Sequence, residues 1–286
     1  MPNISRLRRL KKIAELSAPL RLIIFLGALS ILWLPLALPI YWLLREDSNL
    51  ASILTMALLF LELLCCWQIW GRFVYGDRYI YRRYGLVRNR KNIQEFLQGL
   101  AIGFWLCLGL FITEALLGWI EVIHPSASLI RIIIEGLFSA VGIALAEELL
   151  FRGWLLDELQ RDYSKKTCIW VTAIAYAVAH FLKPVAEIIR TAVTFPALVL
   201  LGITLVLAKY QYGDRLGVSI GIHAGLVWGY YIVNVGQLIK YNNQVPVWVT
   251  GIDGNPISGV MGLLFLSGLA GIIMKHQLWH CICKFE

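Results

Sequence analysis

Long runs of apolar residues, separated by short polar segments, dominate this chain of 286 residues. A helix needs about 20 mostly apolar residues to cross the hydrocarbon core of a bilayer. Helices are the only open-chain structures that satisfy their backbone polar groups in lipid. The pattern therefore predicts an all-α, polytopic transmembrane helical bundle with about eight spans. The predicted spans are 20–44, 50–70, 96–120, 129–156, 167–182, 188–208, 216–239 and 257–274.

Composition and charge agree with a membrane protein. Hydrophobic residues make up 59% of the chain and charged residues 15%, whereas soluble domains carry about 25% charged residues. The net charge of +8 comes from Lys and Arg that flank the apolar runs. This placement marks topology rather than a nucleic-acid surface, so we expect no nucleic-acid partner. The first apolar run is longer than the core of a signal peptide and is expected to remain as a helix.

The basic segments fall on one side of the membrane if eight helices alternate. They are the N-terminal tail, the loop 71–92, the segments after the fourth and sixth spans, and the C-terminal end. Positive-inside bias then predicts an integral protein of the inner or plasma membrane with both termini in the cytoplasm. The sequence has no internal repeats, and its six cysteines form no secreted-type disulfide framework. We therefore expect a single membrane domain over residues 1–286.

Two adjacent glutamates, Glu147 and Glu148, lie inside the fourth predicted span. Placing a carboxylate at this depth costs about 2.5 kcal/mol or more. Glu148 and Arg152 are four residues apart and share one helix face, so their charges can neutralise each other. Glu147 is rotated by about 100° from Glu148 and can face a cavity instead. The alternative interpretation is an ion-pair network that holds helices together.

Two histidines lie at a similar depth in other predicted spans: His180 in the fifth and His223 in the seventh. With a rise of about 1.5 Å per residue, both histidines and Glu147 lie within about 20 Å of the inner ends of their spans. They can therefore meet in one cavity if these three helices adjoin. A single intramembrane histidine is often no more than a hydrogen-bonding residue between helices.

A carboxylate and two imidazoles can activate water. The carboxylate can take a proton from water, and one imidazole can orient that water or share the proton. The second imidazole can donate to a developing oxyanion. The same side chains are also ligands that Zn²⁺ accepts, so the residues alone leave the metal open. The HExxH arrangement of common zinc proteases is absent.

Three motifs in order resemble those of the CPBP family, the CAAX proteases and bacteriocin-processing enzymes also called Abi. EExxxR matches Glu147, Glu148 and Arg152, and FxxxH is represented by Tyr176 to His180 with Tyr in place of Phe. The third motif, HxxxN or HxxxD, begins at His223 but ends in Val227. The resemblance covers a catalytic core of about 129–239.

The resemblance implies an intramembrane endopeptidase that acts on membrane-anchored or lipidated substrates, of which prenylated CAAX peptides are one class. Glu147 would be the general base, His180 would assist it, and His223 would support the oxyanion. Glu148 and Arg152 would fix the geometry of the cavity. Both metal-dependent and metal-free mechanisms have been argued for the family, and we favour one that requires no cofactor, with zinc as the alternative.

Val227 keeps a second function open. Valine cannot donate a hydrogen bond, and losing one oxyanion donor can reduce turnover by about 10²–10³-fold. A catalytically weak or inactive membrane scaffold or immunity protein that retains the fold is therefore the main alternative. A transporter with a proton relay through Glu62, Glu147 and His180 is a third interpretation, against which the absence of internal repeats counts.

Overall fold

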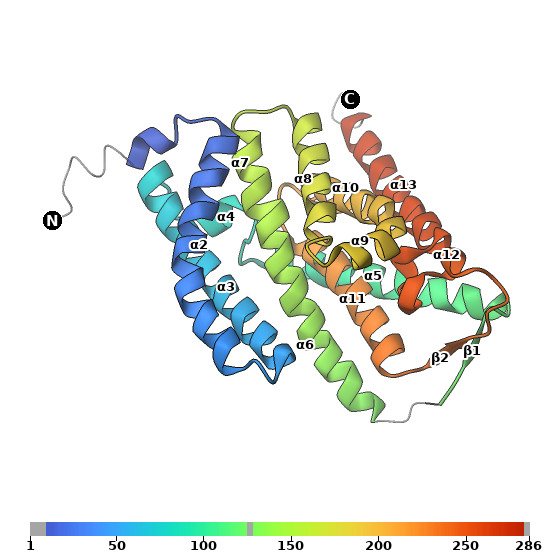
Figure 1. Cartoon of the computed structure of the whole chain (residues 1–286). Helices are drawn as coiled ribbons and strands as arrows, with labels where there is room; N and C mark the ends of the chain where they lie inside the picture. Colours follow the sequence, from blue (N-terminus) through green and yellow to red (C-terminus); the bar gives the residue numbers. More distant parts are fainter. Residues whose placement is uncertain (1–9, 125–127, 283–286) are drawn as a thin grey trace. The chain divides into compact units, whose positions relative to one another are not determined.

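The structure, a computed structural model, describes residues 10–124 and 128–282. Most of these residues are helical, which confirms the predicted class of polytopic helical bundle (Figure 1). Within the described ranges, six helical segments are long and apolar enough to cross a membrane. They are Ala18–Leu43, Ser48–Tyr75, Arg90–Leu116, Leu129–Gln160, Val185–Gln211 and Gly217–Val235. The chain is an integral membrane protein.

Each of the eight predicted spans contains a helix, but the bounds of several helices differ from the prediction. The fifth becomes α8 (Lys165–Ala179), which has 15 residues. The eighth becomes α13 (Val260–Ile282), whose apolar part is Val260–Lys275. The predicted start of the eighth span at 257 is wrong, because residues 256–258 form a separate 3₁₀ turn. Pro196 lies in the first turn of α10, where a missing N–H costs no helical hydrogen bond.

The chain divides into two compact units, of which the first contains residues up to Arg83 together with Asp157–Tyr163. Its helices are α2 (Ala18–Leu43), α3 (Ser48–Trp70), η1 (Gly71–Tyr75) and α4 (Ile80–Arg83). Arg21 is buried and its Nε donates to Glu158 Oε2 at 2.9 Å. The Tyr75 hydroxyl donates to the same carboxylate. This buried polar group ties α2 and the end of η1 to segment 157–163.

The second unit contains residues 84–156 and 164 onwards. Its α-helices are α5 (Arg90–Leu116), α6 (Leu129–Glu148), α8, α9 (Val185–Thr191), α10 (Phe195–Gln211), α11 (Gly217–Val235), α12 (Val247–Thr250) and α13. Its other elements are β1 (Ile120–Val122), β2 (Ile239–Tyr241), η2 (Leu149–Leu155), η3 (Ala192–Thr194), η4 (Ile252–Gly254) and η5 (Pro256–Ser258). The helix α7 (Leu156–Gln160) follows η2.

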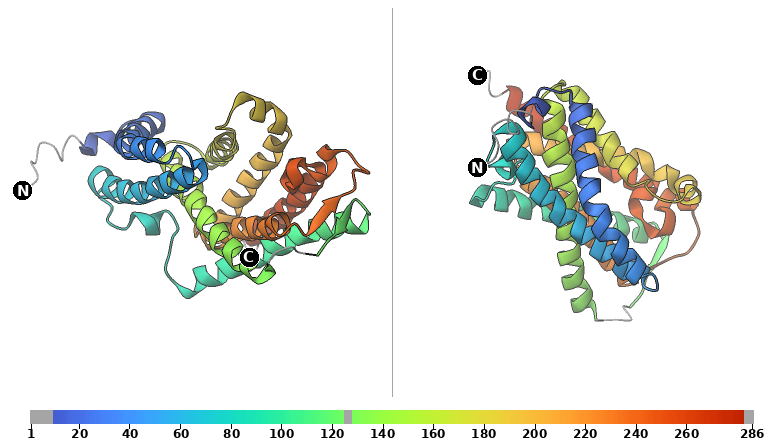
Figure 2. Two further views of the ribbon diagram at one scale, coloured as in Figure 1. Left: turned by 60° about the horizontal axis from the view of Figure 1, so that its bottom comes forward. Right: turned by 60° about the vertical axis from the view of Figure 1, so that its left-hand side comes forward.

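Within the unit, α11 packs on α5 and α6, and α10 packs on α8 and α13 (Figure 2). The strands pair antiparallel, with Glu121 opposite Lys240.

Glycines bring the backbones of α5 and α11 into contact. They recur at every fourth position of α11, at Gly217, Gly221, Gly225 and Gly229. A Cβ atom on Gly221 would lie 2.2 Å from the carbonyl oxygen of Phe96, and one on Gly103 would lie 2.1 Å from that of Ile222. Small residues at this spacing allow membrane helices to approach closely. His223 lies within this contact region of α11, so its backbone position is closely fixed.

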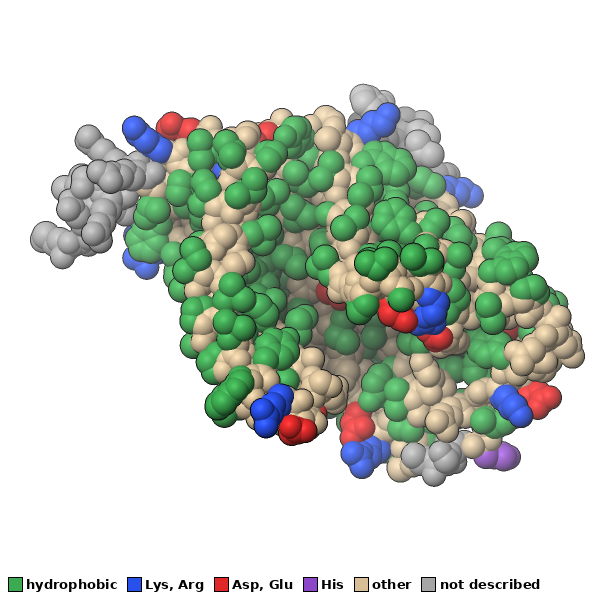
Figure 3. All heavy atoms as spheres, in the orientation of Figure 1, with side chains coloured by type: hydrophobic (Ala, Val, Ile, Leu, Met, Phe, Trp, Pro, Cys, Tyr) green, Lys and Arg blue, Asp and Glu red, His purple; other side chains and the backbone are tan. Residues whose placement is uncertain are grey.

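The sides of the long helices are covered with exposed apolar side chains. Ile31 of α2, Phe138 of α6 and Ile189 of α9 are examples that are more than 70% exposed. Figure 3 shows hydrophobic side chains over most of the visible face, with Lys, Arg, Asp and Glu gathered mainly near helix ends. An exposed apolar surface of this extent is expected of a protein that lipid surrounds.

The glycine contact predicts a specific loss of stability. Gly221→Val places a side chain against the backbone of α5, and overpacking of this kind costs about 1–3 kcal/mol. Gly142→Val on α6 is the matched control, because a Cβ there meets nothing within 4 Å. Thermal unfolding in detergent, followed by size-exclusion chromatography, should show a lower midpoint for Gly221→Val alone. Equal midpoints for both variants would contradict the close contact.

Candidate active site

The paired glutamates end α6 at a change of helix type. Glu147 and Glu148 are its last two residues, and the π-helix η2 follows and carries Arg152. A π-helical turn changes the direction of nearby side chains and is frequent at functional sites. The sequence predicts a regular helix here, which is wrong over Leu149–Leu155. Even so, Glu148 and Arg152 remain in contact, as their spacing predicts.

Glu148 and Arg152 form a fully buried ion pair. Arg152 Nη1 donates to Glu148 Oε1 at 2.8 Å, and both side chains have no exposed surface. Arg152 Nη2 donates to the carbonyl oxygen of Gly202 at 3.3 Å. The guanidinium carbon lies 4.3 Å from the centroid of the Tyr176 ring, a cation–π contact. The arginine therefore joins α6, α8 and α10.

The two imidazoles are oriented in the same way by different partners. His223 Nδ1 lies 3.0 Å from Glu148 Oε1. Because an ionised carboxylate only accepts hydrogen bonds, we assign the proton of this imidazole to Nδ1. His180, directly after α8, places Nδ1 2.8 Å from the carbonyl oxygen of Tyr176, which assigns its proton to Nδ1 as well. In their neutral forms, both rings therefore have Nε2 as an acceptor.

Glu147 lies between these two Nε2 atoms. Its Oε2 is 3.8 Å from His180 Nε2 and 3.8 Å from His223 Nε2. This oxygen is buried and has no hydrogen-bond partner among the described residues. A separation of 3.8 Å is too long for a direct hydrogen bond. A water molecule that bridges these atoms can donate its two hydrogens to Glu147 Oε2 and to one of the two Nε2 atoms.

Charge balance adds to this conclusion. The cluster contains the two carboxylates of Glu147 and Glu148 and the single guanidinium of Arg152, which sum to one negative charge when the histidines are neutral. One proton on either imidazole brings the sum to zero. Buried charges need such compensation because solvation by water is lost.

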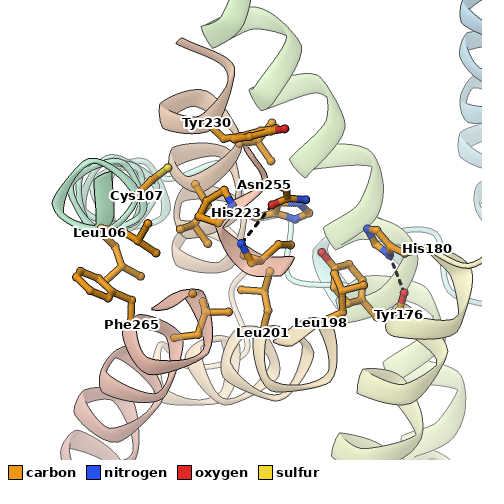
Figure 4. A pocket seen from close by; sticks show the side chains of 17 residues that line it. Leu106, Cys107, Tyr176, His180, Leu198, Leu201, His223, Tyr230, Asn255 and Phe265 are labelled. Atoms are coloured by element: carbon orange, nitrogen blue, oxygen red, sulfur yellow. Dashed lines mark hydrogen bonds between the residues drawn. The ribbon is translucent and has the colours of Figure 1, made fainter. Parts of the chain in front are cut away.

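A cavity of about 170 Å³ opens beside the two histidines (Figure 4). Its polar side chains come from α8 and its C-terminal cap, from α11 and from the turn between η4 and η5: Tyr176, His180, His223, Tyr230 and Asn255. Most of the remaining wall is apolar, and Val227 is part of it. Glu147 is not one of the lining residues, and it adjoins the cavity through His180 and His223. A largely apolar cavity with a few polar groups is typical of a ligand site.

The zinc alternative has been compared with the geometry of these donors. Zinc binds His nitrogen and carboxylate oxygen at about 2.0–2.2 Å in a tetrahedral arrangement. Within residues 10–124 and 128–282, no three His, Cys, Asp or Glu side chains are arranged to hold a metal ion. The donor set thus does not fit a closed zinc centre.

The structure brings the five residues selected from the sequence into one cluster, and their catalytic roles stay predictions. Two features of the site were not predicted from the sequence. The bond from His223 to Glu148 is not visible in the sequence, although the third motif gave a position for His223. Asn255 was missed entirely, because it lies in a turn outside the motif-bearing spans. An Asn-Pro pair ahead of an apolar run was the available signal.

These observations define a class: a polytopic membrane protein with a carboxylate and two imidazoles buried beside an apolar cavity. Residues 128–229 match the family model of the type II CAAX prenyl endopeptidases, Rce1-like. The resemblance drawn from the three motifs is thereby confirmed over this segment, which includes all five selected residues. At the level of the family, the match supports a CAAX-type intramembrane protease. No curated protein and no solved structure matches the chain.

The buried ion pair predicts a strong dependence of stability on Arg152. Arg152→Leu leaves the carboxylate of Glu148 buried without its cation, which typically costs about 3–5 kcal/mol. Arg131→Leu is the matched control, because Arg131 pairs with Glu135 on the same helix at the same spacing but on the surface. Thermal unfolding in detergent should show a large loss for Arg152→Leu and almost none for Arg131→Leu. Similar midpoints would contradict a stabilising role for the buried pair.

Proposed function

We propose that this protein is an intramembrane endopeptidase that hydrolyses a peptide bond in a membrane-anchored or lipidated substrate. One observation carries the proposal: the buried, unpartnered Oε2 of Glu147 lies 3.8 Å from the Nε2 atoms of both His180 and His223. This is the geometry that activates a water molecule. The match to the Rce1-like family supports the same reaction class.

In the proposed reaction, a water molecule next to Glu147 attacks the carbonyl carbon of the substrate. Its proton passes to Glu147 Oε2, and His180 Nε2 accepts the second hydrogen bond of the water and orients it. The new C–O bond gives a tetrahedral intermediate with a negatively charged oxygen. The C–N bond then breaks, and the proton on Glu147 passes to the leaving nitrogen. Glu147 returns to its ionised form in each cycle.

His223 has a different part in this proposal. Its Nδ1 already donates to Glu148, so Nε2 can donate to the intermediate only when the ring carries a second proton. With that second proton, the formal charges of Glu147, Glu148, Arg152 and His223 sum to zero. The protonated ring then donates from Nε2 to the oxyanion, as preorganised donors do in acyl transfer. Glu148 and Arg152 hold His223 in place and do not take part in bond making.

The apolar cavity walls agree with a substrate that reaches the site from the bilayer. Leu106, Leu198 and Leu226 are among the lining residues, and they would accept a lipid chain or an apolar peptide segment. Positive-inside bias predicts that both termini lie in the cytoplasm. We therefore expect cleavage near the cytoplasmic leaflet. Residues 1–9 of the basic tail, part of that argument, lie outside the described residues.

The alternative of a non-catalytic scaffold or immunity protein depends on Val227. Valine stands one turn after His223, in the wall of the cavity, where the family motif has a hydrogen-bonding side chain. A scaffold needs the fold but not the carboxylate of Glu147. The substitution of that carboxylate therefore separates the two functions.

Glu147→Gln should abolish cleavage while the protein still accumulates, because an amide cannot take the proton from water. Quantitative proteomics of membranes from null, wild-type and Glu147→Gln cells is the measurement, with Glu135→Gln on the exposed face of α6 as control. The same unprocessed peptides should accumulate in null and Glu147→Gln membranes. A cellular phenotype that persists in Glu147→Gln without any accumulated peptide would instead favour the scaffold.

A purified-protein assay tests the lipidated class directly. The probe is a quenched fluorescent peptide with a farnesylated cysteine fourth from its C-terminus, the position used in CAAX motifs. Cleavage should persist after treatment with a metal chelator, because the proposed steps use Glu147, His180 and His223 alone. A stoichiometric zinc content, with activity lost on chelation and restored by zinc, would contradict the metal-free mechanism.

A further inference from the structure

The oxyanion site proposed above lacks one donor on α11. Val227 stands four residues after His223, about 6 Å along the helix, and contributes only methyl groups to the cavity wall. An oxyanion in a tetrahedral intermediate needs more than one aligned donor for efficient turnover. A second donor must therefore come from another part of the cavity wall.

Asn255 is the amide side chain in that wall. It lies half-buried between η4 and η5 and lines the same cavity as His223 and Val227. Its Oδ1 accepts a hydrogen bond from the backbone N–H of Ile257 at 3.2 Å. This bond fixes the amide plane, and in the described part of the chain Nδ2 has no hydrogen-bond partner. Figure 4 shows Asn255 and His223 among the side chains that line this cavity.

Tyr230 is the competing donor in the cavity. It stands seven residues after His223, about 10 Å along α11, and its hydroxyl accepts from Asn234 Nδ2, which leaves its O–H able to donate. Tyr176 is fully buried, with the guanidinium of Arg152 over its ring and the ring of His180 4.6 Å from its centroid. These contacts make Tyr176 part of the wall that supports the histidines.

The turn that carries Asn255 is attached on both sides. Thr194 Oγ1 donates to Ser258 Oγ at 3.0 Å, which joins η5 to η3. Arg190 Nη1 donates to Asp253 Oδ2 at 2.7 Å, which joins η4 to α9. The first turn of α13 packs so closely that a Cβ on Gly262 would lie 2.0 Å from the carbonyl oxygen of Pro256. Asn255 is therefore held in place before any substrate binds, as an oxyanion donor requires.

We propose that Asn255 Nδ2 is the second oxyanion donor and replaces, from a different element, the side chain that Val227 lacks. The inference rests on the proposed endopeptidase function. In each cycle the amide N–H donates a hydrogen bond to the negatively charged oxygen, and no covalent bond of Asn255 changes. The matched family segment ends at residue 229, so this residue lies outside it.

The test compares two positions for one amide. Asn255→Ser keeps a short oxygen that can accept from Ile257 N–H but removes the amide donor. Its kcat should fall by about 10²–10³-fold with little change in KM. Adding Val227→Asn to Asn255→Ser places an amide on α11. The kcat of this double variant should be at least about tenfold higher than that of Asn255→Ser. Rates are measured with the quenched farnesylated peptide, and accumulation of unprocessed membrane peptides is measured in cells.

Asn234→Ser is the matched control, because this asparagine lies on α11 but does not line the cavity. It should retain the wild-type kcat. An unchanged kcat in Asn255→Ser, or no recovery in the double variant despite an unchanged unfolding midpoint, would overturn the assignment. So would a loss in Tyr230→Phe with Asn255→Ser unaffected, which would give the donor role to the tyrosine.

The same experiment separates this inference from the proposed function. If Glu147→Gln is inactive and Asn255→Ser is fully active, the endopeptidase stands and the donor assignment fails. The proposed endopeptidase function fails if Glu147→Gln keeps wild-type cleavage. It also fails if the wild-type protein cleaves neither the farnesylated peptide nor any membrane peptide. The role of Asn255 then fails with it.

Discussion

The candidate site depends on the buried contact of Glu148 with both Arg152 and His223. One carboxylate oxygen accepts from Arg152 Nη1 and lies at hydrogen-bonding distance from His223 Nδ1. Buried charges are costly unless their partners are close and well aligned. Here the arginine also reaches the backbone of α10 and the ring of Tyr176. A charge that has to be neutralised inside lipid thus fixes the helices that carry the imidazoles.

Glu147 differs from Glu148 in its partners, although the Oε2 atoms of both are buried without a hydrogen-bond partner among the described residues. Glu148 has a cation and an imidazole, whereas Glu147 Oε2 has two Nε2 atoms at a distance that excludes direct bonding. The two glutamates are adjacent in sequence but about 100° apart around the helix, so one faces the ion pair and the other faces the histidines. One glutamate can therefore be structural while the other is available for proton transfer.

The cavity wall is positioned by a different kind of interaction. The backbone of α11 lies against α5 through glycines, so no side chain separates the two helices. The turn around Asn255 is held by side-chain hydrogen bonds to α9 and η3 and by close packing on α13. Close packing and polar anchors both limit movement of this wall. Such rigidity is what electrostatic stabilisation of a transition state requires.

The sequence by itself determined the membrane class, most of the spans and the five polar residues of the cluster. Long apolar runs leave few alternatives in lipid, and ionisable residues within them are conspicuous because insertion is costly. It also predicted the contact between Glu148 and Arg152, because helical spacing is a local property.

Only the tertiary structure decided which partner each of these residues has. The link from His223 to Glu148 joins positions 75 residues apart, and the equal distances from Glu147 to both imidazoles depend on the packing of α6, α8 and α11. The π-helical turn and Asn255 were not predictable, because helix type and the path of a turn are set by contacts with distant elements. Local periodicity indicates which residues are buried. The relative positions of side chains on different helices are set by helix packing, which no single segment encodes.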